Sequence, residues 1–173
     1  QVGDLIHQAR QVAKPGPVAY LAIATAFGPR RSELCSIQQQ DIHDDPGSPP
    51  ALMIRAAKRG AWRTMQLPNE VVPILGQHVF RPLALNTMSK IWVNLMEGTI
   101  GGQPGTGFHT IRRSLATELL KAGASETAVA KFMGWALGNQ WGALPVYDWR
   151  TDEDLFPDLW PLHPFLVLWQ CEG

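Results

Sequence analysis

The spacing of apolar and polar positions predicts that most of this chain is helical. Residues 109–122 carry an apolar stripe with helical spacing and end at Gly123, a residue type that closes helices. Residues 18–27 are almost wholly apolar, which predicts a buried helix that begins after the prolines at 15 and 17. A shorter stripe lies near the N-terminus, and further helices are expected at 69–79, at 88–96 and after Ser125.

Two short segments have the pattern of strands instead. Residues 51–54 and 62–67 are rich in apolar and β-forming residues, and the turn at 58–61 separates them. Residues 41–50 are expected to form a turn-rich loop. The pattern therefore predicts an α+β protein that is mainly a helical bundle, with a small antiparallel hairpin or three-stranded sheet.

Length and composition fit one globular domain. The chain has 173 residues, of which 45% are hydrophobic and 17% are charged. No apolar run approaches the roughly 20 residues of a membrane span, and no signal peptide is evident, so we expect a soluble, cytoplasmic protein. Cys35 and Cys171 have neither disulfide-framework nor metal-ligand spacing. Because the first residue is Gln1, we expect the chain to be part of a longer protein.

Charge is distributed unevenly along the chain. The formal net charge is zero, which by itself counts against nucleic-acid binding. Residues 148–173, however, hold six acids and one base, which leaves 14 bases and 9 acids in residues 1–147. We therefore expect a basic domain over 1–147 and an acidic, apolar, proline-rich tail over 148–173.

Five residues suggest phosphoryl-transfer chemistry. His109 and Arg112 lie three apart on one predicted helix, which places both on one face near its N-terminus. Arg30 is expected at another helix start, Lys58 lies in the hairpin, and Tyr147 follows later. Arginine can grip phosphate oxygens, lysine can act as an acid and tyrosine can attack phosphorus. A lone His-x-x-Arg is more often a solvated helix start. The phosphoryl-transfer interpretation therefore depends on all five residues occurring together.

The local context of these residues resembles the catalytic domain of the tyrosine recombinases, the phage integrase family. Residues 25–34 resemble the first arginine box, 58–68 the hairpin with its catalytic lysine, and 108–117 with 121–125 the second box. Residues 132–135 stand where the family has Leu-Gly-His, and Tyr147 stands at the position of the nucleophile. The resemblance runs from about 21 to 147 with every box in order.

That resemblance implies a role for each matching residue. Arg30 and Arg112 would clamp the scissile phosphate, Lys58 would protonate the leaving oxygen, and Tyr147 would attack. The product would be a 3′-phosphotyrosyl bond and a free 5′-hydroxyl, formed without ATP, metal or another cofactor. The supporting residues would be His109 for phosphate binding and proton movement, Trp135 for packing at the site, Glu33 to brace Arg30, and Arg31, Arg59, Arg63 and Arg113 to contact DNA.

Several of these roles have an alternative, and Tyr147 itself could be structural rather than catalytic. Trp135 replaces the family's usual histidine and could be ordinary core packing, and Lys58 could be a plain turn residue. Tyr20 is the other tyrosine, but it lies in an apolar helical run and is expected in the core. His43 lies among aspartates, which form turns more often than metal sites. The whole chain could be a non-catalytic DNA-binding or assembly protein, or an enzyme resembling type IB topoisomerases.

The resemblance also concerns assembly. Family members usually carry a helical core-binding domain ahead of the catalytic one, and this sequence has only a short helix there. Expected partners are double-stranded DNA and further copies of the chain, in a tetramer joined through the C-terminal tail. That tail could instead fold back over the basic surface of its own chain. A prokaryotic or phage-encoded origin would fit this family.

Overall fold

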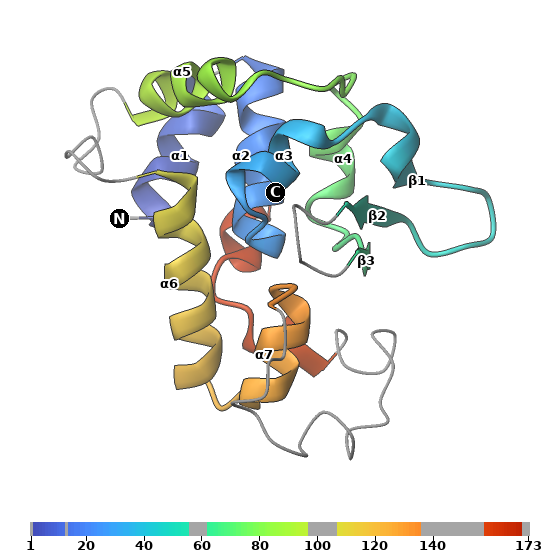
Figure 1. Cartoon of the computed structure of the whole chain (residues 1–173), viewed down its shortest axis with the longest axis vertical. Helices are drawn as coiled ribbons and strands as arrows, with labels where there is room; N and C mark the ends of the chain where they lie inside the picture. Colours follow the sequence, from blue (N-terminus) through green and yellow to red (C-terminus); the bar gives the residue numbers. More distant parts are fainter. Residues whose placement is uncertain (1, 13, 56–61, 97–106, 136–157, 171–173) are drawn as a thin grey trace.

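The computed structural model describes residues 2–12, 14–55, 62–96, 107–135 and 158–170. Helices surround a central helix, α2, and a small sheet lies at one side of them (Figure 1). Every helix within the described ranges is too short or too polar to cross a membrane. The elements are α1 Val2–Val12, α2 Pro15–Phe27, α3 Arg31–Ser36, η1 Gln39–Asp41, β1 Ile42–His43, β2 Ala51–Ile54, β3 Arg63–Gln66, α4 Val72–Leu75, α5 Leu85–Met96, α6 Phe108–Lys121, α7 Glu126–Phe132, η4 Trp160–Leu162 and η5 Leu166–Trp169.

Helix α2 is the centre of the core. All of its residues from Ala19 to Phe27 are buried, which explains why this segment is apolar on every side. It begins at Pro15, earlier than expected, because prolines are tolerated in the first turn of a helix. Helices α1, α4, α5 and α6 pack on it, and the α3 helix follows directly after a tight turn.

The sheet is antiparallel with the order β1-β2-β3, which confirms the expected hairpin. Leu52 of β2 pairs with Met65 of β3, and Ile54 pairs with Arg63. Strand β1 was expected to belong to the turn-rich loop, but Ile42 pairs with Leu52 at the edge of the sheet. Leu52, Ile54 and Met65 are buried, so one face of the sheet covers the helices.

The segment after the sheet differs from the sequence prediction. The helix expected at 69–79 is reduced to α4, Val72–Leu75, which closes at Gly76. After it the chain turns, so that His78 packs edge-on against Tyr20 and Phe80, with ring centroids 5.6 and 4.8 Å apart. This tertiary packing outweighs the local helical spacing. Helix α5 begins at Leu85, ahead of the expected start at residue 88.

The described part of the C-terminal tail, residues 158–170, lies on its own chain. Trp169 Nε1 donates a 2.9 Å hydrogen bond to Thr25 Oγ1, and Arg10 donates to the carbonyl of Leu168. His163 is 2.9 Å from the carbonyl of Ala26 through Nε2, while its Nδ1 accepts the backbone N–H of Phe165, so Nε2 carries the proton. Burial lowers the pKa of His163 to about 4. The contacts of Trp169 and His163 join the tail to the residues just before the α2–α3 turn, and the contact of Arg10 joins it to α1.

Candidate active site

The turn between α2 and α3 holds Arg30 in a fixed position. Gly28 closes α2 with a φ of 55°, a left-handed conformation that favours glycine, and Arg30 follows in an extended conformation. Glu33, one turn into α3, accepts hydrogen bonds from the backbone N–H of Arg30 at 2.7 Å and from its Nη1 at 2.8 Å. The carboxylate therefore orients both the backbone and the side chain of Arg30.

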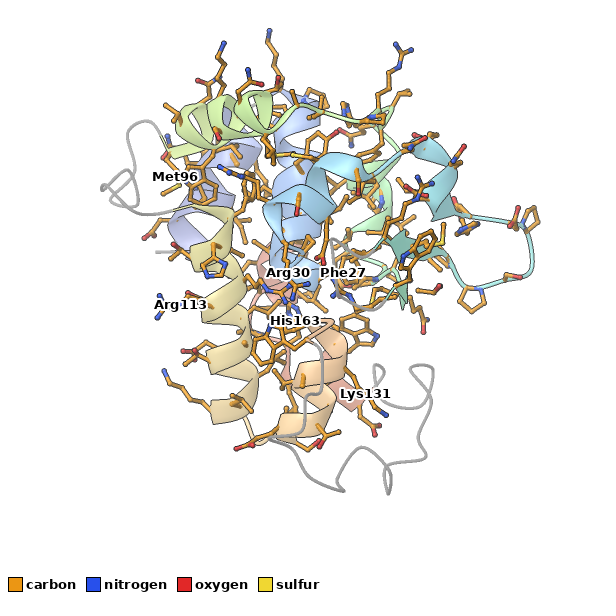
Figure 2. The ribbon with its side chains drawn as sticks, viewed as in Figure 1. Phe27, Arg30, Met96, Arg113, Lys131 and His163 are labelled. Atoms are coloured by element: carbon orange, nitrogen blue, oxygen red, sulfur yellow. The ribbon has the colours of Figure 1, made fainter. Side chains whose placement is uncertain are left out.

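Arg112 reaches the same turn from α6. Its side chain is only 3% exposed, and its two terminal nitrogens donate to the carbonyl of Gly28 and, at 2.5 Å, to that of Met133. His109 lies one turn earlier on α6 and is exposed. His109 and Arg112 are thus three residues apart on one helix, but one is in contact with solvent and the other is buried. Arg113 is also exposed and points away from the helical body (Figure 2).

Arg63 joins the site from β3 and is buried, at 2% exposure. Its Nη2 lies 3.2 Å from Glu33 Oε2, and its Nη1 donates to the carbonyl of Met133 at 2.6 Å. The family resemblance implies a DNA contact for Arg63, whereas in the structure its side chain faces the interior. The alternation of side chains along the strand could have predicted this inward direction, because Arg63 and Met65 share one face and Met65 is apolar.

The C-terminal end of α7 supplies the remaining acceptors. Ser125 caps the other end of this helix as predicted, accepting the N–H of Ala128. At the C-terminal end, Met133 O accepts from both Arg63 and Arg112, and Gly134 O lies 3.4 Å from Arg30 Nη1. Carbonyls at a helix C-terminus have no partner within the helix and carry partial negative charge, which favours arginine there.

Trp135 lies against this group of arginines. Its ring centroid is 5.9 Å from Cζ of Arg112, within the range of a cation–π interaction. The residue is 37% exposed, so it is not ordinary core packing. The structure therefore places Trp135 beside Arg112 at the surface of the molecule.

We call Arg30, Arg63 and Arg112 around Glu33 the arginine cluster. Burial alone would raise the pKa of Glu33, but the hydrogen bond from the Arg30 backbone and the charges of Arg63 and Arg30 outweigh it and lower that pKa. Burial first, then the charges of Arg30 and Arg63, lower the pKa of Arg112 to about 10, so it stays protonated at neutral pH. These four groups thus hold two positive charges in excess.

Five other residues named from the sequence remain to be placed, and the structure describes two of them. Lys58, Arg59 and Tyr147 lie outside the described residues. Arg31 is exposed, and its Nη1 donates to Ser89 Oγ at 3.1 Å. Tyr20 lies in the core as predicted, and burial together with Cys35 raises its pKa to about 12.

Within the part of the chain that the structure describes, no group of three or more His, Cys, Asp or Glu side chains could hold a metal ion. The positively charged side chains around Glu33 are all arginines. Guanidinium groups bind anions with geometric fit to phosphate and carboxylate oxygens.

Comparisons with known proteins agree on the fold. A model of the phage integrase family matches residues 1–140. The XerH site-specific recombinase, solved bound to difH substrate in a pre-cleavage complex, superposes with a TM-score of 0.65 at 14% identity. That match covers 87% of this chain and 52% of XerH. The XerA recombinase gives a TM-score of 0.62 at 19% identity, covering 94% of this chain and 61% of XerA. No curated protein sequence matches the chain.

Proposed function

Because the chain belongs to the phage integrase family, we propose that it is the catalytic part of a site-specific recombinase acting on double-stranded DNA. The observation that carries this proposal is the arginine cluster, which has two positive charges in excess and is held by Glu33 and the carbonyl of Met133. A buried site of this kind favours an anion, and a DNA phosphate supplies one.

The charge of the cluster suits the reaction. A phosphodiester carries one negative charge, and further negative charge develops on its oxygens as a nucleophile attacks. Arg30 keeps 36% of its side chain exposed, and the carbonyls of Gly28 and Met133 occupy two of the five N–H donors of Arg112. Both arginines therefore keep donors for phosphate oxygens, and their positions are fixed before DNA arrives.

In the proposed reaction the hydroxyl oxygen of Tyr147 attacks the scissile phosphorus. A tyrosyl–phosphorus bond forms, the bond from phosphorus to the 5′-oxygen breaks, and Lys58 donates a proton to that oxygen. The tyrosine proton leaves through His109 or water. The product is a 3′-phosphotyrosyl bond and a free 5′-hydroxyl, and attack by a 5′-hydroxyl from another strand reverses the chemistry and completes strand exchange.

Surface residues are proposed to hold the duplex beside the cluster. Arg31 and Arg113 are exposed near Arg30 and Arg112 in sequence, and Arg59 belongs to the same basic part of the chain. Contacts of this type position DNA without reading its sequence. In the proposed tetramer, passing the tail to a neighbour would require Trp169 and His163 to leave their sites on α2.

Trapping on nicked suicide duplexes tests the proposal. Because the target site is unknown, a pool of random duplexes serves as substrate, and a denaturing gel detects covalent complexes. We expect a band with the unmodified chain, none with Tyr147→Phe, and about 100-fold slower formation with Arg112→Gln. Arg81→Gln, which removes an exposed arginine outside the cluster, is the matched control. A band that persists in Tyr147→Phe would contradict the assigned nucleophile.

A further inference from the structure

Arg63 connects three separate segments of the chain at the arginine cluster. It lies on β3, its side chain contacts Glu33 at the start of α3, and it also contacts the carbonyl of Met133 at the end of α7. Both distances are those of hydrogen bonds, 3.2 and 2.6 Å, and the side chain is 2% exposed. Arg112 is buried to the same degree, but among the described residues its terminal nitrogens donate only to neutral carbonyls, whereas the guanidinium of Arg63 is already paired with the carboxylate of Glu33. The charge of Arg63 is therefore matched within the protein, and that of Arg112 remains for a phosphate.

The two acceptors of Arg63 are shared with the proposed phosphate ligands. Glu33 also binds the backbone N–H and the side chain of Arg30. Met133 O also accepts from Arg112, at 2.5 Å. Any movement of Arg63 would thus change the acceptors that orient Arg30 and Arg112.

The backbone next to Met133 is adapted to this arginine. Gly134 has a φ of 60°, and a Cβ atom at this position would lie 1.7 Å from Arg63 Nη1 and 2.8 Å from its Cζ. The guanidinium therefore packs directly against the Cα of Gly134. Only a residue without a side chain leaves room for Arg63 in this position.

We infer that Arg63 is a positioning residue, which holds Glu33 and the Met133 carbonyl so that Arg30 and Arg112 are set for phosphate. The inference rests on the proposed function and goes beyond it by giving Arg63 an indirect role. Arginine suits this role because its planar fork serves two acceptors at once. Lysine would keep the charge, but its single nitrogen cannot hold the same two-sided geometry.

The test compares Arg63→Lys and Arg63→Met with Arg81→Gln, measuring DNA affinity, its salt dependence and the rate of covalent complex formation at saturating DNA. We expect both Arg63 variants to react about 100-fold more slowly, because small displacements of positioned groups have effects of this size. DNA affinity should stay within about threefold, since no phosphate contact is lost. A normal rate in Arg63→Lys, or weaker binding with a salt slope reduced by about 1, would overturn the inference.

A second measurement does not depend on catalysis. The Nε–Hε signal of Arg112 in the ¹⁵N NMR spectrum, assigned by its loss in Arg112→Lys, reports the setting of that guanidinium. It should shift in both Arg63 variants and not in Arg81→Gln, and an unchanged signal would contradict the positioning role. If the unmodified chain formed no covalent complex, the proposed function would fail while this signal still decided the role of Arg63. Arg63→Lys keeps the test valid if Arg63→Met fails to fold.

Discussion

Replacing Glu33 with glutamine should destabilise the protein far more than the same change at Glu118. Glu33 has no exposed side-chain surface and accepts from Arg30 and from Arg63, which is itself 2% exposed. Its pKa is lowered, so the charge is present at neutral pH. Glutamine has a similar shape but leaves the buried guanidinium of Arg63 without a counter-charge. Removing one partner of a buried ion pair costs about 3–5 kcal/mol of unfolding free energy.

Glu118 supplies a matched control. It pairs with Lys121 at a spacing of three residues, the same spacing that separates Glu33 from Arg30, but its side chain is 43% exposed and that of Lys121 is 66% exposed. Solvent screening limits such a pair to less than about 1 kcal/mol. Urea unfolding at pH 7, followed by circular dichroism, measures both variants. If Glu33→Gln lost no more stability than Glu118→Gln, the arginine cluster would not be held by Glu33.

Two further predictions concern stability. Gly134→Ala and Gly123→Ala both place alanine at positive φ, but only the first meets a neighbouring side chain, so thermal unfolding should show an extra loss of at least about 2 kcal/mol for Gly134→Ala. His163 has a folded pKa of about 4, below its ordinary 6.5, so the unfolded chain binds the proton first and stability falls as pH drops through this interval. Urea unfolding at pH 7 and pH 4 should show that His163→Gln removes about 3 kcal/mol of this pH dependence, and equal pH dependence in both proteins would contradict it.

Local patterns predicted much of the fold. The apolar stripe gave α6, Phe108–Lys121, and the capping residue Ser125 gave the start of α7. Both depend on residues close in sequence. The helix expected at 69–79 was wrong for the opposite reason, because the packing of His78 on Tyr20 and Phe80 involves residues far apart in the chain.

The site was only partly predictable for the same reason. Arg30 and Arg112 could be recognised from the family motifs around them, at 25–34 and 108–117. The structure brings both to one turn that is lined by carbonyl groups. The inward direction of Arg63 depends on which face of the sheet covers the core, and its partner Glu33 is thirty residues away. His163 had no local signal at all, because its acceptor is the carbonyl of Ala26 at the other end of the chain.

The most direct test of covalent strand transfer is the chemical identity of the protein–DNA bond. The trapped complex would be digested with protease and nuclease, and the modified peptide would be sequenced by mass spectrometry. We predict a nucleotide attached through its 3′-phosphate to Tyr147, with a free 5′-hydroxyl on the released strand. A bond to another residue, or a 5′-phosphate attached to the protein, would contradict the proposed mechanism.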